Sequence, residues 1–242
     1  MRIGALASSM RLSNLYLNRA TNEYNKSAER IATGKKLSSD LIGQLGQLNN
    51  LKAHKITAEV EISNMQSAKD YVQTKEGALG QINDLAQKIH TEQLAENPNS
   101  DLITAYTSEI TSILKDTKFN GQSVFSETDI AFGANFKVDK TTLMASGTST
   151  LDFTDADTTK DSMDAIVKEL AATGAKSNAI DARININTRT VTNLEEAISR
   201  IEDVDIAEEN INLAKHSTQQ LLAANMITSV QETQANLINM LI

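Results

Sequence analysis

Apolar and small residues near the start of the chain recur at alternating steps of three and four positions. This is the heptad spacing of helices that pack along one another, and it holds over about four repeats. Because glycine readily adopts the backbone that ends a helix, the pattern predicts an amphipathic helix that ends near Gly34 and needs packing partners. The positions in the stripe are Ile3, Leu6, Met10, Ser13, Leu17, Ala20, Tyr24, Ser27 and Ile31.

A second helical pattern runs from near Asp40 to about Asn97, which at 1.5 Å per residue would extend over roughly 85 Å. The segment 97–100 contains the single proline and interrupts this pattern, so Ser100 or Asp101 is expected to cap a shorter third helix. The positions in step along the second helix are Ala58, Ile62, Met65, Lys69, Val72, Glu76, Leu79, Ile82, Ala86 and Ile89.

Helical periodicity stops at residues 118–121, where Asn120-Gly121 favours a tight turn. Short apolar runs follow at 122–125, 130–138 and 141–144, separated by Gly, Asn, Asp and Ser. Runs of this kind predict one or two β-hairpins.

A helical pattern resumes near residues 159–161 and continues to the end of the chain, so both termini are predicted to be amphipathic helices. Its heptad positions are Ile184, Asn187, Val191, Leu194, Ile198 and Ile201, and later Met226, Val230, Thr233, Leu237 and Met240. The predicted fold is mainly α, a long antiparallel helical rod or coiled coil with a small β-hairpin insert. The expected domains are a discontinuous terminal-helix domain, residues 1–36 with 206–242, and a rod domain, residues 37–205, with its insert at 119–158.

Composition narrows the classes of function. A net charge of −8 over 242 residues disfavours nucleic-acid binding, because that binding depends on Lys and Arg neutralising phosphates. No apolar run reaches the roughly 18 residues of a membrane helix, so membrane insertion is not expected. We also expect no signal peptide, and zero cysteine excludes disulfides and thiolate sites.

No constellation of residues indicates catalysis, a cofactor or a metal. His54, His90 and His216 each stand alone without a second ligand at metal spacing and are expected to be ordinary surface residues. Residues 34–36 lack the earlier glycine of a phosphate-binding loop, and residues 152–161 lack the third ligand and the turn glycine of a calcium loop. We therefore expect a protein that is not an enzyme and uses no cofactor.

Charged residues are densest between residues 195 and 209. Two interpretations stay open: a solvated helix face, or a polar contact surface toward a neighbouring subunit. The candidate polar contact face consists of Arg30, Arg200, Glu202, Asp203 and Asp205.

The terminal heptad stripes are the most informative feature. They are either closed within one chain or also buried between chains, and we favour the second interpretation because a lone amphipathic helix is marginal in water. The candidate subunit interface consists of Ile3, Leu6, Met10, Leu17, Tyr24, Ile31, Leu222, Met226, Val230, Leu237 and Leu241.

Motifs at residues 29–37, 74–79, 119–121 and 199–208 resemble those of bacterial flagellin. Residues 29–37, E-R-I-A-T-G-K-K-L, look like the family's E-R-L-S-S-G-x-R-I, and residues 74–79, T-K-E-G-A-L, are similar to its T-x-E-G-A-L. Residues 119–121 are similar to the F-N-G that closes the conserved amino-terminal part. Residues 199–208, S-R-I-E-D-V-D-I-A-E, match the S-R-I-E-D-x-D-x-A-x-E stretch closely and are the strongest signal.

The resemblance implies a structural subunit that self-assembles into the bacterial flagellar filament for motility. It implies secretion to the extracellular filament, and contacts with flagellar cap, hook-junction and export-chaperone proteins. The alternative within the same superfamily is a hook–filament junction protein, which shares the helical ends.

Two departures from the family pattern are visible. Only about forty residues separate Gly121 from the returning helix, so the variable outer domains of larger flagellins are expected to be absent. Residues 87–93 lose an Arg, a Glu and a Leu of the family's Q-R-x-R-E-L-A, so the resemblance does not extend to recognition by the innate immune receptor.

Overall fold

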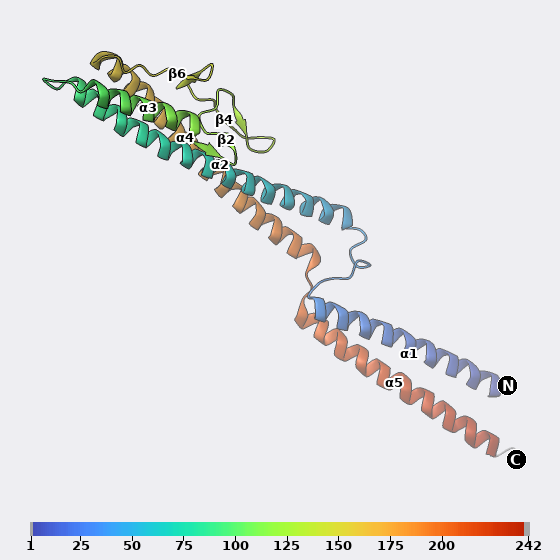
Figure 1. Ribbon diagram of the computed structural model, residues 1–242. Helices are drawn as coiled ribbons and strands as arrows, with labels where there is room; N and C mark the ends of the chain where they lie inside the picture. Colours follow the sequence, from blue (N-terminus) through green and yellow to red (C-terminus); the bar gives the residue numbers. More distant parts are fainter. Residues whose placement is uncertain (1, 240–242) are drawn as a thin grey trace. The chain divides into compact units, whose positions relative to one another are not determined.

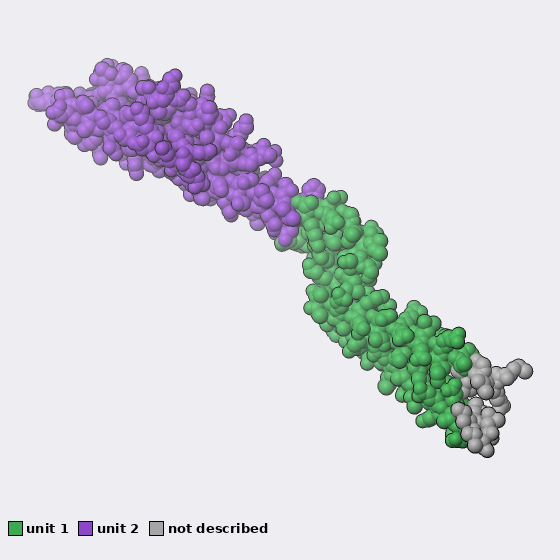
Figure 2. Space-filling view, turned by 45° about the vertical axis from the view of Figure 1, so that its right-hand side comes forward, with its two compact units in different colours: residues 1–53, 194–242 green, residues 54–193 purple. Residues whose placement is uncertain are grey.

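The computed structural model describes residues 2–239, with the side chains of residues 2–6, 237 and 238 outside the description. The described chain divides into two compact units (Figure 2): unit 1 comprises residues 1–53 and 194–242, and unit 2 comprises residues 54–193. The helices are α1 (Arg2–Thr33), α2 (Leu45–Gln93), α3 (Ser100–Asp116), α4 (Ala156–Glu202) and α5 (Ile206–Asn239). The strands are β1 (Lys118–Phe119), β2 (Gln122–Ser123), β3 (Ile130–Ala131), β4 (Lys137–Val138), β5 (Met144–Ala145) and β6 (Thr148–Ser149).

The mainly α prediction is confirmed, since helices with small antiparallel strand pairs make up the described chain. Within unit 1, α1 and α5 pack along each other in opposite directions, as their two ribbons in Figure 1 show. In the described residues, no helix combines the length and the apolarity of a membrane span.

The predicted end of the first helix is also confirmed. α1 ends at Thr33, and Gly34 has a φ of +69° while its N–H donates to the Arg30 carbonyl at 2.8 Å. A residue with a Cβ would be strained in this left-handed conformation, so the stop is encoded by the glycine itself.

The boundaries of the next helices differ from the prediction by a few residues. α2 begins at Leu45 rather than near Asp40, because the Asp40 carboxylate accepts the Leu37 N–H at 3.1 Å and stabilises a turn instead. α3 is capped by Asn99 rather than by Ser100 or Asp101, since the Asn99 Oδ1 accepts the N–H groups of Asp101 and Leu102.

The β section contains three two-residue antiparallel pairs instead of one or two hairpins: β1 with β2, β3 with β4, and β5 with β6. The Asn120-Gly121 turn joins the first pair, with φ values of +48° and +80°. Ladders this short supply little stability. The insert is held mainly by apolar side chains buried against the helices, which are Val124, Phe125, Phe136, Val138, Leu143 and Phe153.

α4 begins at Ala156, earlier than the expected 159–161, because Asp155 caps it. The Asp155 Oδ1 accepts the Thr158 N–H at 2.8 Å, and these Thr158 hydrogen bonds hold the pKa of Asp155 below its usual value. Asp155 lies directly before the first residue of α4 and only a few residues after β6, so the chain passes from the insert into the returning helix without a long linker.

The core of unit 2 lies between α2, α3, α4 and the insert. Most of the predicted stripe of α2 is buried, but Glu76 is exposed and Lys75 beside it is buried. Tyr71 is also buried, and its hydroxyl donates to the Val124 carbonyl at 2.9 Å. Burial raises the pKa of Tyr71 to about 12, so the phenol stays a neutral donor.

Candidate subunit interface

Small residues form the innermost line of contact between α1 and α5. Ser13, Ala20 and Ser27 are buried at seven-residue steps, and Ala223 of α5 is buried as well. Side chains of this size allow two helices to approach closely. The residues at one position of the predicted heptad are therefore buried within the chain.

The larger residues of the predicted amino-terminal stripe remain accessible in part. Met10, Leu17, Tyr24 and Ile31 are half-buried along the flank of the α1–α5 pair. Each keeps apolar surface that a second helix pair could cover.

On α5, the predicted interface residues Leu222 and Met226 are more than half exposed, while Val230 is half-buried. The side chains of Ile3, Leu6 and Leu237 and the whole of Leu241 lie outside the described residues.

A further apolar stripe was missed by the heptad analysis. Leu12, Leu15 and Tyr16 are all more than half exposed on α1, and Leu15 reaches 63%. Their spacing of three and four places them on one face of the helix, so this signal was present in the sequence. On α5, Ile211 and Leu221 are likewise more than half exposed.

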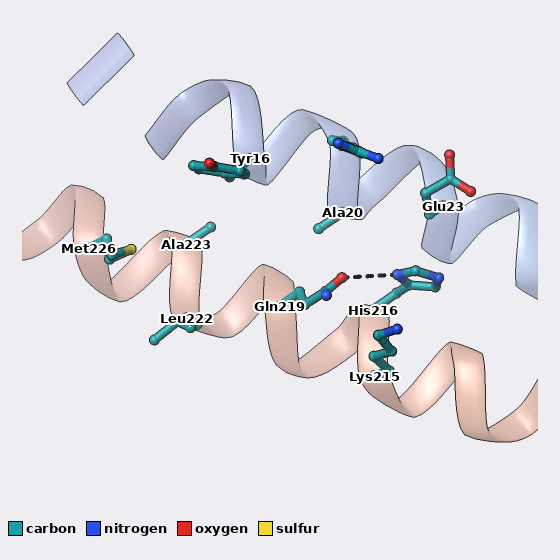
Figure 3. Close-up of a pocket in the computed structure, with 10 residues that line it drawn as sticks. Tyr16, Ala20, Glu23, Lys215, His216, Gln219, Leu222, Ala223 and Met226 are labelled. Atoms are coloured by element: carbon teal, nitrogen blue, oxygen red, sulfur yellow. Dashed lines mark hydrogen bonds between the residues drawn. The ribbon is translucent and has the colours of Figure 1, made fainter. Parts of the chain in front are cut away.

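A groove of about 570 Å³ lies along the α1–α5 pair (Figure 3). Tyr16, Ala20 and Ala223 line its apolar part, and Met226 lies at the same end as Tyr16. At the other end, the His216 Nδ1 shares a hydrogen bond with the Gln219 side chain at 3.1 Å. An apolar side chain from another molecule fits this chemistry better than a polar substrate does.

Charged side chains cross-link the ends of α1 and α5 within the chain. Arg30 makes two hydrogen bonds to the Asp40 carboxylate, at 2.9 and 3.0 Å, and a third to Glu209 of α5 at 3.1 Å. The Arg30 guanidinium holds the pKa of Asp40 below its usual value. Burial raises the pKa of Glu209, but its polar neighbours, among them the Arg30 guanidinium that donates a hydrogen bond to it, outweigh this, so its pKa is also lowered.

A second group of contacts joins the segment that follows α1 to the end of α4 and the residues before α5. The Glu202 Oε1 lies 3.0 Å from the Lys52 Nζ and 3.4 Å from the Lys35 Nζ. The hydrogen bond from Lys52 lowers the pKa of Glu202. Backbone bonds run from the Lys36 N–H to the Glu202 carbonyl at 2.7 Å and from the Val204 N–H to the Gly34 carbonyl at 3.1 Å. We refer to the contacts of Arg30, Asp40 and Glu209 and those of Lys35, Lys52 and Glu202 together as the clamp.

The remaining residues of the predicted polar face lie around the clamp. Arg200 is exposed and lies 3.9 Å from Glu196. Asp203 pairs with Lys35 in an isolated backbone bridge. Asp205 caps α5, since its Oδ1 accepts the Ala207 N–H at 2.8 Å. Arg30 and Glu202 thus act within one chain, and a contact of this face with a neighbouring subunit stays a prediction.

The clamp unites the two segments that carry the strongest resemblance, residues 29–37 and 199–208. Comparison with known families gives the same assignment. Residues 5–129 match the bacterial flagellin N-terminal helical region, and residues 156–241 match the bacterial flagellin C-terminal helical region. The chain belongs to the flagellin family.

Relatives of this flagellin are similar along most of their length. It is 24% identical to Secreted flagellin C of Campylobacter jejuni subsp. jejuni, covering 95% of this chain and 97% of the relative. It is 24% identical to Flagellin FljO of Caulobacter vibrioides over 93% of both chains. It is 26% identical to a flagellin of Halalkalibacterium halodurans, over 84% of this chain and 88% of the relative.

Family membership makes this flagellin a structural subunit of the extracellular flagellar filament and not an enzyme. Flagellins polymerise with copies of themselves, which agrees with the apolar surface left open on α1 and α5. The matches do not favour the junction-protein alternative.

Proposed function

We propose that this flagellin polymerises by burying, between copies, the apolar face that the α1–α5 pair leaves open. We use the term open face for the two apolar stripes together, the exposed one with Leu12, Leu15, Tyr16, Leu222 and Met226 and the half-buried one with Met10, Leu17, Tyr24, Ile31 and Val230.

The observation that carries the proposal is the exposure of large side chains on both helices of the pair. A fully buried Leu or Met gains roughly 1.5–3 kcal/mol over an exposed one, so a few such residues per contact supply a large favourable term. A monomeric protein seldom leaves such a patch uncovered. The groove beside Tyr16 and Met226 gives one place where a neighbouring copy can insert an apolar side chain.

The domain boundaries proposed for this role follow the two helix breaks. The α1 stop at Gly34 and the break at 203–205 before α5 support this proposed division into residues 1–36 with 206–242 and residues 37–205. The first set would lie between copies in the filament, and the second would carry the insert.

The resemblance also supports contacts with the flagellar cap, the hook-junction proteins and an export chaperone. Before assembly, the open face of α1 and α5 exposes apolar side chains to water. A chaperone that covers this face until export would prevent premature association.

Truncation tests the proposal directly. A chain that ends at Asp205 lacks α5 and is expected to form no filaments, as measured by ultracentrifugal pelleting and electron microscopy. Normal long filaments from this truncated chain would contradict the proposal.

A point variant separates loss of the open face from loss of the helix. Leu15→Asp introduces a charge at an exposed position of α1 and should abolish pelleting while circular dichroism stays unchanged. Asn18→Asp introduces the same charge at an exposed polar position of α1 and serves as the matched control.

A further inference from the structure

A small pocket with a positively charged lining lies in unit 2, between α2, α4 and the segment that follows β4. Its volume is about 210 Å³. Four lysines and two carboxylates line it, which are Lys75, Lys140, Lys168 and Lys176 with Asp139 and Glu169. The local net charge is therefore +2, in a chain whose total net charge is −8. A concave surface of this charge attracts anions.

Hydrogen bonds fix the walls of the pocket. One oxygen of Glu169 accepts the Lys75 ammonium at 2.6 Å, and the other accepts the Thr142 N–H at 3.3 Å and the Thr142 hydroxyl at 2.9 Å. These bonds join α2, α4 and the insert, so the pocket is preformed. Val72 and Val138 are buried against it, and an apolar lining strengthens the interactions of the charges.

Lys75 carries hydrogen-bond donors that the chain leaves unused. Its ammonium has three N–H groups, although the residue is only 3% exposed. In the hydrogen bonds of the described residues, this ammonium donates to Glu169 alone. A buried donor without an acceptor is costly, and Lys75 lines the pocket, so its remaining N–H groups favour an oxygen ligand there.

Asp139 does not close the pocket to an anion. Its carboxylate lies 3.2 Å from the Lys176 Nζ, but its side chain is 78% exposed. Exposed ion pairs contribute little to stability, so an anion can replace this carboxylate at Lys176 at low cost. The Lys176 ammonium is held in place by the Phe136 ring, whose centre lies 5.3 Å away.

Two further lysines have no partner of their own. Among the described residues, neither the Lys140 nor the Lys168 ammonium has a hydrogen-bond or ion-pair partner. Lys168, Ala172 and Lys176 follow one another at steps of four on one face of α4. The small Ala172 leaves space between the two lysines for a ligand. A pocket of this size lies below the roughly 300–1,000 Å³ of sites for larger molecules, which favours a small ion or group.

We propose that this pocket binds a phosphate dianion through the ammonium groups of its four lysines. Lysine binds phosphate as a point charge, and a local net charge of +2 matches a dianion. The source is either free inorganic phosphate or the phosphate group of a phosphomonoester, since Lys140 and Lys168 leave the pocket open to solvent. Bound phosphate bridges α2, α4 and the insert and thereby stabilises unit 2. The site is independent of the open face on α1 and α5.

Titration of the free chain with inorganic phosphate tests the site, with ionic strength held constant by potassium chloride. Saturable changes in amide chemical shift are expected at residues 138–142 and 168–176, and not at residues 206–236. Lys140→Gln and Lys168→Gln each remove an unpaired charge and should weaken binding about tenfold. Lys160→Gln is the matched control, because Lys160 is an exposed lysine of α4 that does not line the pocket. All three lysines are exposed, so circular dichroism should not change.

A second titration with glycerol 3-phosphate distinguishes the two sources of the phosphate group. Binding at least as tight as that of inorganic phosphate assigns the pocket to a phosphomonoester. Weaker binding assigns the pocket to free phosphate, because the glycerol then obstructs entry.

Two results would overturn the site. One is a response to phosphate that rises without saturation. The other is an equal loss of binding in Lys160→Gln and Lys168→Gln. Either result indicates general attraction to positive charge rather than a pocket. Equal competition by chloride at the same concentration would overturn the preference for a dianion.

Discussion

Lys75 and Glu169 form a nearly fully buried ion pair that ties α2 to α4. The Lys75 Nζ lies 2.6 Å from the Glu169 Oε1, and the other carboxylate oxygen accepts the N–H and hydroxyl of Thr142 in the insert. Burial raises the pKa of Glu169, but the Lys75 ammonium and Thr142 outweigh this, so the pKa is lowered. One carboxylate thus positions both the returning helix and the insert.

Removing one partner of this pair should be costly. Lys75→Met leaves the Glu169 carboxylate buried without its cation and should lower the free energy of unfolding by about 3–5 kcal/mol in urea denaturation. The double variant Lys75→Met/Glu169→Gln should lose clearly less, because no uncompensated charge remains. The control Lys69→Met breaks a more exposed pair with Asp181 and should cost only about 0–1 kcal/mol. Equal losses in the single and double variants would refute this account.

The clamp should make unit 1 sensitive to acid. Asp40 and Glu202 have lowered pKa values in the folded chain. Each carboxylate therefore stabilises the fold at a pH above its ordinary pKa, which is 3.8 for Asp40 and 4.5 for Glu202. This stabilisation is lost as the pH falls below about 4.5 and both carboxylates become protonated. Thermal unfolding between pH 6 and 3 should show a falling midpoint, with a shallower fall in Glu202→Gln. An identical pH profile in Glu202→Gln would show that the Glu202 contacts contribute nothing.

At the scale of elements, side chains and glycines near the termini of the helices decide where each helix begins and ends. Asn99 caps α3, Asp155 caps α4 and Asp205 caps α5, each through backbone N–H groups that the helix leaves unpaired. Gly34 ends α1 through a left-handed conformation. The breaks that these residues create allow the segments at 34–36 and 201–204 to meet in the clamp.

Substituting Gly34 tests the importance of this stop. Gly34→Ala should lower the free energy of unfolding by about 1–2 kcal/mol, because an L-residue is strained at positive φ although no neighbouring atom obstructs the Cβ. Gly43→Ala is the control, since Gly43 has an ordinary φ and equally open space. Similar stabilities of the two variants, measured by chemical denaturation, would contradict the role of the left-handed conformation.

For the molecule as a whole, the two units differ in how completely each buries its apolar residues. Unit 2 has a continuous core in which Leu79, Ile82, Ile89, Leu114 and Ile166 are fully buried. The α1–α5 pair of unit 1 buries mainly small residues and leaves large ones exposed. This division fits a filament subunit in which unit 2 has a core of its own, while the α1–α5 pair depends on neighbouring copies to cover its large apolar residues.

Amide hydrogen exchange can detect this difference. Exchange in residues 7–33 and 206–236 should slow at least tenfold when the free chain polymerises, because neighbouring copies then suppress the opening of α1 and α5. The buried core of α2 around Ile82 should change little, which provides an internal control. Equal protection of the terminal helices before and after polymerisation would contradict completion by neighbours.

Much of the fold could be predicted from the sequence because its determinants are local. Heptad spacing sets the face of each long helix, Gly34 ends α1, and Asn120-Gly121 forms a turn. The segments at 29–37 and 199–208 identified the family without any contact being known. Periodicity over many turns is robust to errors at single positions, which is why the helices themselves were predictable.

Tertiary structure alone decided which residues of these patterns face each other. Lys75 is buried beside the predicted stripe because Glu169, 94 positions away, supplies its counter-charge. Arg30 and Glu202 lie in an intrachain clamp. The small residues at heptad positions of α1 are buried in the α1–α5 contact, whereas Leu12, Leu15 and Tyr16 remain exposed. These outcomes depend on distant partners and on side-chain size across a contact, which spacing along one helix does not encode.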